Sequence, residues 1–302
     1  MIMFRRLKNL NLRNQFFFMS DVIVTGASGF IGVALCELLN KLGFSIIALN
    51  RADGDISKHS VWSSLPPVKT VFHLAGRSFI PDSWLQTSDF LDVNVSSTHY
   101  ALEYCRRTGA KLIFASAYIY GIPQVLPISE QHPIFPNNPY ALTKFLSEQL
   151  CEFYSTYHSV TVISLRLFNV YGPRQSSNFL IAKIIHELNE FRAVRLLDLA
   201  PKRDYVYVDD VANAFVRAMH IDSGYHIFNI GSGFSYSVSE IVDKIQLIMR
   251  TNHPIKVDSV ERRNEIPDVI ADISLAKEVL GWYPNVELPQ GLVQTIDHFT
   301  KS

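Results

Sequence analysis

Two side chains near the middle of the chain have types and spacing suited to acid–base chemistry. Tyr140 and Lys144 are four residues apart, which places both on one face of a helix. An adjacent ammonium favours the phenolate and lowers the pKa of a phenol. Tyr140 is therefore expected to take a proton from a substrate hydroxyl or to return one to a ketone. Because such pairs also occur on exposed helices without any function, the interpretation needs a third residue.

Ser116 is the candidate for that third residue. It follows the apolar run 111–115, which is typical of a strand. Ligands of open α/β sheets collect where strands end, so the Ser116 hydroxyl is expected to orient the substrate oxygen. The alternative is a serine that only caps a turn or a helix. With Tyr140 and Lys144, Ser116 completes the predicted catalytic set.

Three glycines predict a dinucleotide site. Gly26, Gly29 and Gly32 follow the β-rich run 22–24 and precede a helical pattern. In this arrangement the first glycine permits a tight turn, the second lets the backbone approach a pyrophosphate, and the third lets the helix pack against the strand. An ordinary strand-to-helix turn is the alternative, and the position after the first strand favours the dinucleotide.

The choice of dinucleotide stays open. The second predicted strand ends at Asn50 and Arg51, where an NAD site usually has an acid for the ribose 2′-hydroxyl. Arg51 either contacts the 2′-phosphate of NADP or is a solvated surface residue. Asp53 or Asp55 can still reach the ribose or the adenine. The sequence therefore predicts NAD or NADP without deciding between them.

The surrounding pattern predicts an α/β fold, a Rossmann-type doubly wound parallel sheet with a smaller C-terminal α/β substrate-binding domain. Residues 21–167 form the expected dinucleotide-binding domain, to which segments at about 203–230 return, and residues 168–302 mainly form the second. The strands are expected at 45–49, 68–74, 111–115, 160–165 and 203–208, and the helices at 95–107, 141–157, 180–191, 210–219 and 238–249.

Composition excludes several classes of protein. The 28 basic residues balance the 28 acidic ones, so no broad field attracts nucleic acid. No apolar stretch reaches the roughly 20 residues of a membrane span. Cys36, Cys105 and Cys151 lack metal-ligand spacing, which predicts no metal site and free thiols in a reducing cytoplasm. Residues 1–20 are interpreted as a disordered or wrongly assigned extension, with a targeting peptide or a membrane-surface helix as alternatives.

The ordered motifs resemble extended short-chain dehydrogenases/reductases of the NAD-dependent epimerase/dehydratase family, from Asp21 to about Phe299. They are TGASGFIG at 25–32, GDI at 54–56, FHLAG at 72–76, Asn94, SAYIYG at 116–121, YALTK at 140–144, RLFNVYGP at 166–173, RDYVYVDD at 203–210, RRNE at 262–265 and GW at 281–282.

The resemblance implies a role for each matched residue. Ser116, Tyr140 and Lys144 would be the catalytic triad, and Asn169, Arg203 and Arg262 would hold the diphosphate of a nucleotide sugar. Relatives often pair through the helices at 95–107 and 141–157, which implies a homodimer. The cofactor would contact Gly26, Ser28, Gly29, Phe30, Ile31, Gly32, Asn50, Arg51, Asp55, Ile56, Leu74, Ala75, Gly76, Asn94, Tyr140 and Lys144.

The same resemblance leaves the reaction open. Dehydratases carry an acid pair where this chain has Ala117 and Tyr118, so dehydration is not expected. A nucleotide-sugar 4-epimerase is favoured by Ala117 and by FNVYGPRQ at 168–175. An NADPH-dependent 4-keto-6-deoxy-sugar reductase is favoured by Arg51, by DSWL at 82–85 and by Asn264 with Glu265. A dinucleotide-binding protein without catalysis is the third hypothesis, and the base and the sugar are not readable.

Overall fold

The computed structural model describes residues 21–258 and 265–301. The expectations for residues 1–20 and for Arg262 lie outside the described residues. The first part of the molecule is built around one parallel sheet of strand order β2-β1-β3-β4-β5-β9, to which residues 22–167 give five strands and a later segment gives β9. Its strands are β1 (Val22–Thr25), β2 (Ile46–Leu49), β3 (Thr70–His73), β4 (Lys111–Ala117), β5 (Val162–Leu167) and β9 (Tyr225–Ile230).

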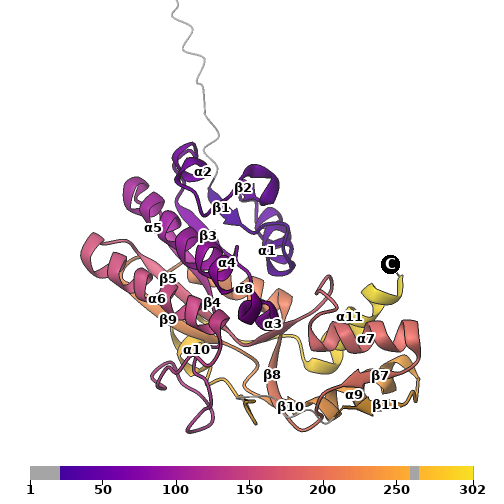
Figure 1. Cartoon of the computed structure of the whole chain (residues 1–302). Coiled ribbons are helices and arrows are strands. Elements are labelled where there is room, and N and C mark those ends of the chain that lie inside the picture. Colours follow the sequence, from indigo (N-terminus) through magenta and orange to yellow (C-terminus); the bar gives the residue numbers. More distant parts are fainter. Residues whose placement is uncertain (1–20, 259–264, 302) are drawn as a thin grey trace, which may run out of the picture.

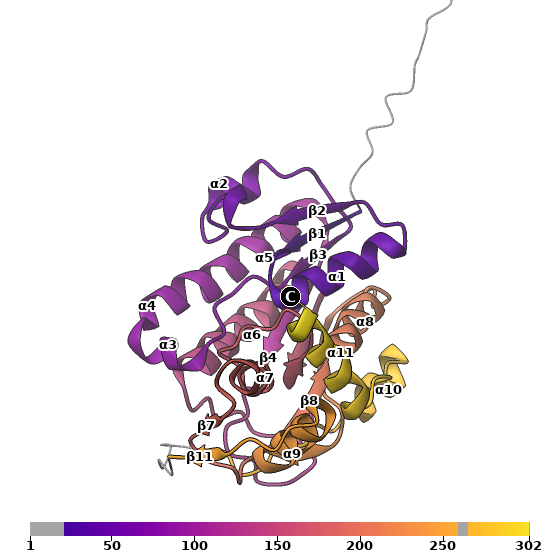
Figure 2. The same ribbon diagram turned by 90° about the vertical axis from the view of Figure 1, so that its right-hand side faces the viewer.

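The sheet is covered by helices on both faces, as Figures 1 and 2 show. Every residue of β1, β3 and β5 is buried, which is the expected state of a parallel strand enclosed from both sides. The predicted doubly wound fold is confirmed. One face carries α1 (Phe30–Lys41) and α8 (Val208–Ala218), and the other carries α5 (Ser97–Thr108) and α6 (Pro139–His158).

Several short elements lie at the edge where the strands end. The strand order reverses beside β1, with β2 on one side and β3 on the other, and such a switch point is where open α/β sheets bind ligands. These elements are η1 (Arg51–Asp53), α3 (Ile80–Leu85), α4 (Thr87–Phe90) and the π-helical turn η2 (Leu91–Ser96). The short helix α2 (His59–Ser63) packs against α5, where the Trp62 carbonyl accepts a hydrogen bond from Arg107.

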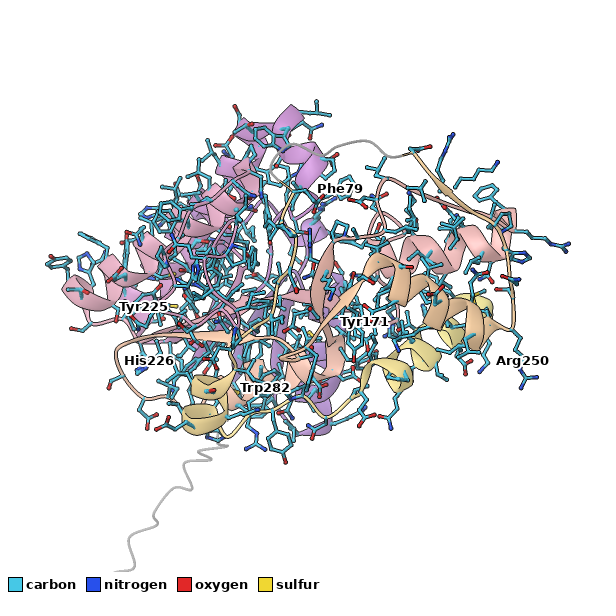
Figure 3. All side chains as sticks on the ribbon, turned by 90° about the horizontal axis from the view of Figure 1, so that it is seen from below. Phe79, Tyr171, Tyr225, His226, Arg250 and Trp282 are labelled. Atoms are coloured by element: carbon cyan, nitrogen blue, oxygen red, sulfur yellow. The ribbon has the colours of Figure 1, made fainter. Side chains whose placement is uncertain are left out.

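The later part of the chain forms a second, smaller layer around two short sheets of order β10-β8-β6 and β11-β7. Tyr171 lies at its junction with the first part and Arg250 at its far end (Figure 3). Its elements are β6 (Asn169–Tyr171), α7 (Leu180–Phe191), β7 (Val194–Leu196), β8 (Lys202–Tyr207), β10 (Ser235–Ser237), α9 (Val238–Met249), β11 (Ile255–Val257) and α11 (Leu288–Lys301). The later helix α10 (Ser274–Leu280) instead packs against β9 and α8 of the first part.

The chain crosses between the two parts more than once. β9 and α8 join the first part as expected, but β8 pairs with β6 and β10 instead. The fully buried Asp204 carboxylate holds one crossing in place, since it accepts hydrogen bonds from the backbone amides of Ser232, Gly233 and Ala271 at 2.6 to 3.0 Å. The two parts are therefore coupled through a shared buried acid.

Cys36, Cys105 and Cys151 are free thiols. Among the described residues, no helix has the length and the apolar character that a membrane crossing requires.

Candidate functional site

The α6 helix carries Tyr140 and Lys144 in its first two turns. Asn138 caps the helix because its side-chain oxygen accepts a hydrogen bond from the Ala141 amide at 2.9 Å. Pro139 begins the helix with a φ angle that already suits it. Tyr140, Lys144 and Ser116 all line one cleft of about 1140 Å³ between the two parts of the molecule. The structure thus brings the predicted catalytic residues together.

Lys144 is held where the β4 strand ends. Its ammonium donates a 2.8 Å hydrogen bond to the Ala115 carbonyl and lies 4.8 Å from the centre of the Phe114 ring. Burial lowers the pKa of Lys144 to about 8, because a low-dielectric environment disfavours the charged form. A Cβ atom on Gly76 would lie only 3.5 Å from the Lys144 Nζ, so this ammonium faces the predicted cofactor loop.

The Tyr140 phenol differs from its expected state. Burial raises the pKa of this phenol instead of lowering it, and Phe90 packs edge-on against its ring at 6.4 Å. The expectation that Lys144 lowers the Tyr140 pKa is therefore wrong for this structure. The physical reason is that desolvation outweighs the ammonium, which is already hydrogen-bonded to the Ala115 carbonyl.

Ser116 has a partner that the sequence analysis missed. Its hydroxyl donates a 2.5 Å hydrogen bond to Oε1 of Glu148. Glu148 in turn forms a buried ion pair with Arg166, whose guanidinium lies 2.6 Å from Oε2. The signal was available, because Glu148 is four residues beyond Lys144 on the same face of α6.

The glycine turn fits a dinucleotide phosphate. A Cβ atom on Gly32 would lie 2.1 Å from the Gly26 carbonyl oxygen, so only glycine permits this approach of helix to strand. Gly26 has a φ of +68°, and a Cβ there would lie 2.9 Å from the Ala75 amide. The α1 N-terminus has no side-chain cap and no acid in its first turn, which leaves its amides for an anion. The cleft that Tyr140, Lys144 and Ser116 line is also lined by residues of the glycine turn and of the loop after β3: Gly26, Gly29, Phe30, Ile31, Gly32, Leu74 and Gly76.

Two buried polar groups hold this edge in shape. Thr25 accepts a hydrogen bond from the Ala75 amide at 3.1 Å and contacts Nδ1 of His73 at 2.9 Å. Asn94 accepts a hydrogen bond from the Arg77 amide at 2.8 Å and donates one to the Thr143 hydroxyl at 2.9 Å. Asn94 thus links the loop to α6, and its expected contact with the cofactor stays a prediction.

The remaining expected cofactor residues lie outside the lining of the cleft. Ser28 is exposed in the glycine turn, and Ala75 lies against Gly26. Asn50, Arg51, Asp55 and Ile56 follow β2, whose end lies next to that of β1. The Asn50 side-chain oxygen accepts a hydrogen bond from the Ala52 amide, and the Asp53 carboxylate accepts one from the Asn50 amide, both at 2.9 Å. These two hydrogen bonds fix the turn after β2 that carries the exposed Arg51.

We predict that Arg51→Ala weakens NADP binding about 10-fold and changes NAD binding little, because it removes one charge-assisted phosphate contact of 1.5 kcal/mol or so. Isothermal titration with each dinucleotide measures both affinities, and Arg192→Ala, in the smaller part, is the control. Equal losses for the two dinucleotides would contradict a 2′-phosphate contact.

The opposite wall of the cleft comes from the smaller part. Asn169 and Arg203 both line the cleft. The Asn169 amide donates to the Asp204 carbonyl at 3.2 Å, and Arg203 forms an ion pair with Glu265. Phe79, labelled in Figure 3, packs edge-on against Phe179 at 6.0 Å across the cleft. The cleft is therefore lined by the glycine turn on one side and by Arg203 on the other.

Known proteins with related sequences and structures agree with this geometry. The family model described as "NAD dependent epimerase/dehydratase family" matches residues 22–231. A UDP-glucose 4-epimerase of Mycolicibacterium smegmatis is 30% identical over 92% of this chain and 97% of its own length.

Two solved structures share the fold. MoeE5 in complex with UDP-glucose and NAD has a TM-score of 0.87 at 30% identity, covering 93% of this chain and 99% of its own. RMD from Pseudomonas aeruginosa, complexed with NADPH, has a TM-score of 0.86 at 25% identity, with the same coverage of both chains.

Proposed function

Because the chain belongs to the NAD-dependent epimerase/dehydratase family, we propose that this NAD(P)-dependent enzyme epimerises a nucleotide-diphosphate sugar at C4. The observation that carries the proposal is the shared cleft, which Tyr140, Lys144 and Ser116 line together with the glycine turn. A similar protein is named UDP-glucose 4-epimerase, and a similar structure contains UDP-glucose with NAD. UDP-glucose is therefore the first substrate to test.

In the proposed mechanism Tyr140 exchanges a proton with the C4 oxygen of the sugar. Lys144 would hold the cofactor beside Gly76. It also places a positive charge one helical turn from the Tyr140 phenol. A nicotinamide dinucleotide held at the glycine turn would supply the reversible hydride acceptor that exchange at C4 requires. Arg203 and Asn169, with Arg262, are proposed to hold the diphosphate.

Two neighbouring residues support epimerisation over dehydration. Elimination of water needs an acid and a base at the adjacent carbons. Ala117 brings no proton, and the Tyr118 hydroxyl donates a hydrogen bond to the Gly121 carbonyl. Burial raises the pKa of Tyr118, and neither residue brings a carboxylate. The two positions after Ser116 therefore supply no acid pair for dehydration.

The second candidate is an NADPH-dependent reductase of a nucleotide 4-keto-6-deoxy sugar. The exposed position of Arg51 beside β1 favours it, as does the similarity to a protein complexed with NADPH. Mass spectrometry of the dinucleotide that copurifies and an assay with UDP-glucose separate the two. Conversion of UDP-glucose to UDP-galactose without consumption of added cofactor supports the epimerase. Stoichiometric oxidation of NADPH by the keto sugar would contradict the epimerase and support the reductase.

The proposal includes a homodimer that forms through α5 and α6. The two helices pack side by side, and α6 exposes large apolar side chains, with Phe153 at 49% and Tyr157 at 71%. We predict that Phe153→Glu converts a dimer into a monomer, because a buried unpaired charge opposes association. Light scattering measures the mass, and Phe191→Glu, an exposed aromatic on α7, is the control. A monomeric wild-type protein would contradict the dimer.

A further inference from the structure

A buried carboxylate lies directly behind the proposed diphosphate contacts. Asp204 follows Arg203 in β8 and has no exposed surface. Neighbouring side chains of a strand point to opposite faces, and Arg203 and Tyr205 on either side of Asp204 both line the cleft. Asp204 therefore lies on the face of β8 that is turned away from the cleft. Any effect of its side chain on a ligand there must pass through other residues.

The Asp204 carboxylate accepts four hydrogen bonds from two other segments of the chain. Its Oδ1 accepts from the amide and the hydroxyl of Ser232 at 2.6 and 2.7 Å. Its Oδ2 accepts from the amides of Gly233 and Ala271 at 2.9 and 3.0 Å. A Cβ atom on Gly231 would lie only 2.9 Å from Oδ2, so the turn after β9 approaches the acid where it has no side chain. This one carboxylate therefore joins three segments.

The segment 265–271 connects this carboxylate to the Arg203 guanidinium. Ala271, at one end of the segment, donates to Asp204. At the other end, the Ile266 carbonyl accepts a hydrogen bond from Arg203 at 2.7 Å, and Glu265 forms the ion pair with Arg203. The position of the guanidinium in the cleft therefore depends on where Asp204 holds this segment.

Asp204 also contacts the second residue proposed to bind the diphosphate. Its backbone carbonyl accepts a hydrogen bond from the Asn169 side chain at 3.2 Å, and β6 pairs in parallel with β8 beside it. Arg203 and Asn169 come from different strands, yet both are oriented by the same residue of β8. The carboxylate acts on the arginine, and the carbonyl acts on the asparagine.

We propose that Asp204 is a positioning residue for the diphosphate of the substrate, because it holds Arg203 and Asn169 in the arrangement that binds this group. The inference rests on the proposed function, which assigns those two side chains to the diphosphate. Donors that are already in place bind a ligand more tightly than donors that must be ordered on binding. The proposed dinucleotide site at the glycine turn is on the other side of the cleft, so its affinity should not depend on Asp204.

Asp204→Asn keeps the size of the side chain and replaces one acceptor oxygen by a donor. In either orientation the amide nitrogen meets two of the four donors, so Ser232 on one side, or Gly233 and Ala271 on the other, must lose their hydrogen bonds. We expect D204N to bind UDP about 10-fold more weakly, the loss that follows when one charge-assisted contact is misplaced. The affinity for NAD should change less than about 2-fold. Isothermal titration measures both affinities.

Steady-state kinetics with UDP-glucose supply a second measurement. A residue that only positions the diphosphate contacts acts on binding and leaves the chemical step alone. In D204N the KM should therefore rise about 10-fold, while kcat should fall less than about 3-fold.

Asp210→Asn is the matched control. Asp210 is another buried carboxylate that accepts hydrogen bonds from two backbone amides, those of Asn285 and Val286, both at 3.0 Å. D210N should lower the free energy of unfolding, as D204N does, and leave the UDP affinity unchanged. The double variant R203A/D204N should bind UDP less than about 3-fold more weakly than R203A, since most of the effect passes through Arg203.

Three results would overturn the inference: an unchanged UDP affinity in D204N, an equal loss of NAD affinity, or the full loss again in the R203A background. If D204N does not fold, Ser232→Ala decides. It removes one of the four hydrogen bonds and should weaken UDP binding about 3-fold with NAD unchanged, and no loss overturns the inference. If D204N behaves as expected but the wild type does not interconvert UDP-glucose and UDP-galactose, the proposed epimerase fails and the inference stands.

Discussion

Tyr140→Phe is expected to lower kcat by about 100-fold or more while the dinucleotide stays bound, because the phenol is the positioned acid and base of the proposed reaction. Phenylalanine keeps the ring that packs edge-on against Phe90 at 6.4 Å, so the fold should not change. Turnover is measured with UDP-glucose and UDP-galactose, and bound dinucleotide by mass spectrometry of the purified protein.

The control for this variant is Tyr283→Phe, which removes the hydroxyl of an exposed tyrosine outside the cleft. It should leave kcat within the error of the assay. Near-normal turnover in Tyr140→Phe would remove Tyr140 from the mechanism. Loss of bound dinucleotide along with turnover would instead mean that the phenol helps to bind the cofactor, and the effect on kcat would then need measurement at saturating NAD and NADP.

Lys144→Met is expected to abolish turnover and, at pH 7, to make the protein more stable. Burial lowers the Lys144 pKa from 10.5 to about 8, so keeping this ammonium charged costs roughly 3 kcal/mol at about 1.4 kcal/mol per pKa unit. The hydrogen bond to the Ala115 carbonyl, worth about 1 kcal/mol, offsets part of this cost. The free energy of unfolding should therefore rise by about 2 kcal/mol.

The pH dependence of this gain has a defined sign. Between pH 8 and pH 10.5 the unfolded chain keeps a proton that the folded protein has released, so the stability of the wild type rises with pH in that window. The advantage of Lys144→Met should shrink over the same window. Urea titrations at pH 7, 9 and 10 measure it, with the exposed Lys301→Met as control. A variant less stable than the wild type at pH 7 would contradict the cost of burial.

Local patterns were predicted well from the sequence. The helices α7 and α9 begin and end where the apolar periodicity does, and Tyr140 and Lys144 share a face because four residues make about one helical turn. The glycine turn was equally readable, since the close approach of Gly32 to the Gly26 carbonyl depends on residues only six positions apart. Each of these features is determined by neighbours in the chain.

Features that depend on distant residues were predicted less well. The expected return of residues 203–230 to the first part holds for β9 and α8, but β8 pairs with β6 and β10. An apolar alternation predicts that a strand forms, but it does not predict which other strand it will pair with. The motif predicts a cofactor contact for Asn94, and only the packing of α6 shows that its amide also links Arg77 to Thr143.

By itself, the sequence determined the family and the parallel fold and predicted the catalytic side chains, because these follow from short motifs and their order. Only the tertiary structure decided the electrostatic state of the site. Burial raises the Tyr140 pKa and lowers that of Lys144, and Glu148 with Arg166 takes the Ser116 hydrogen. Desolvation and buried hydrogen bonds depend on which atoms surround a group, and those atoms come from segments that are far apart in the chain.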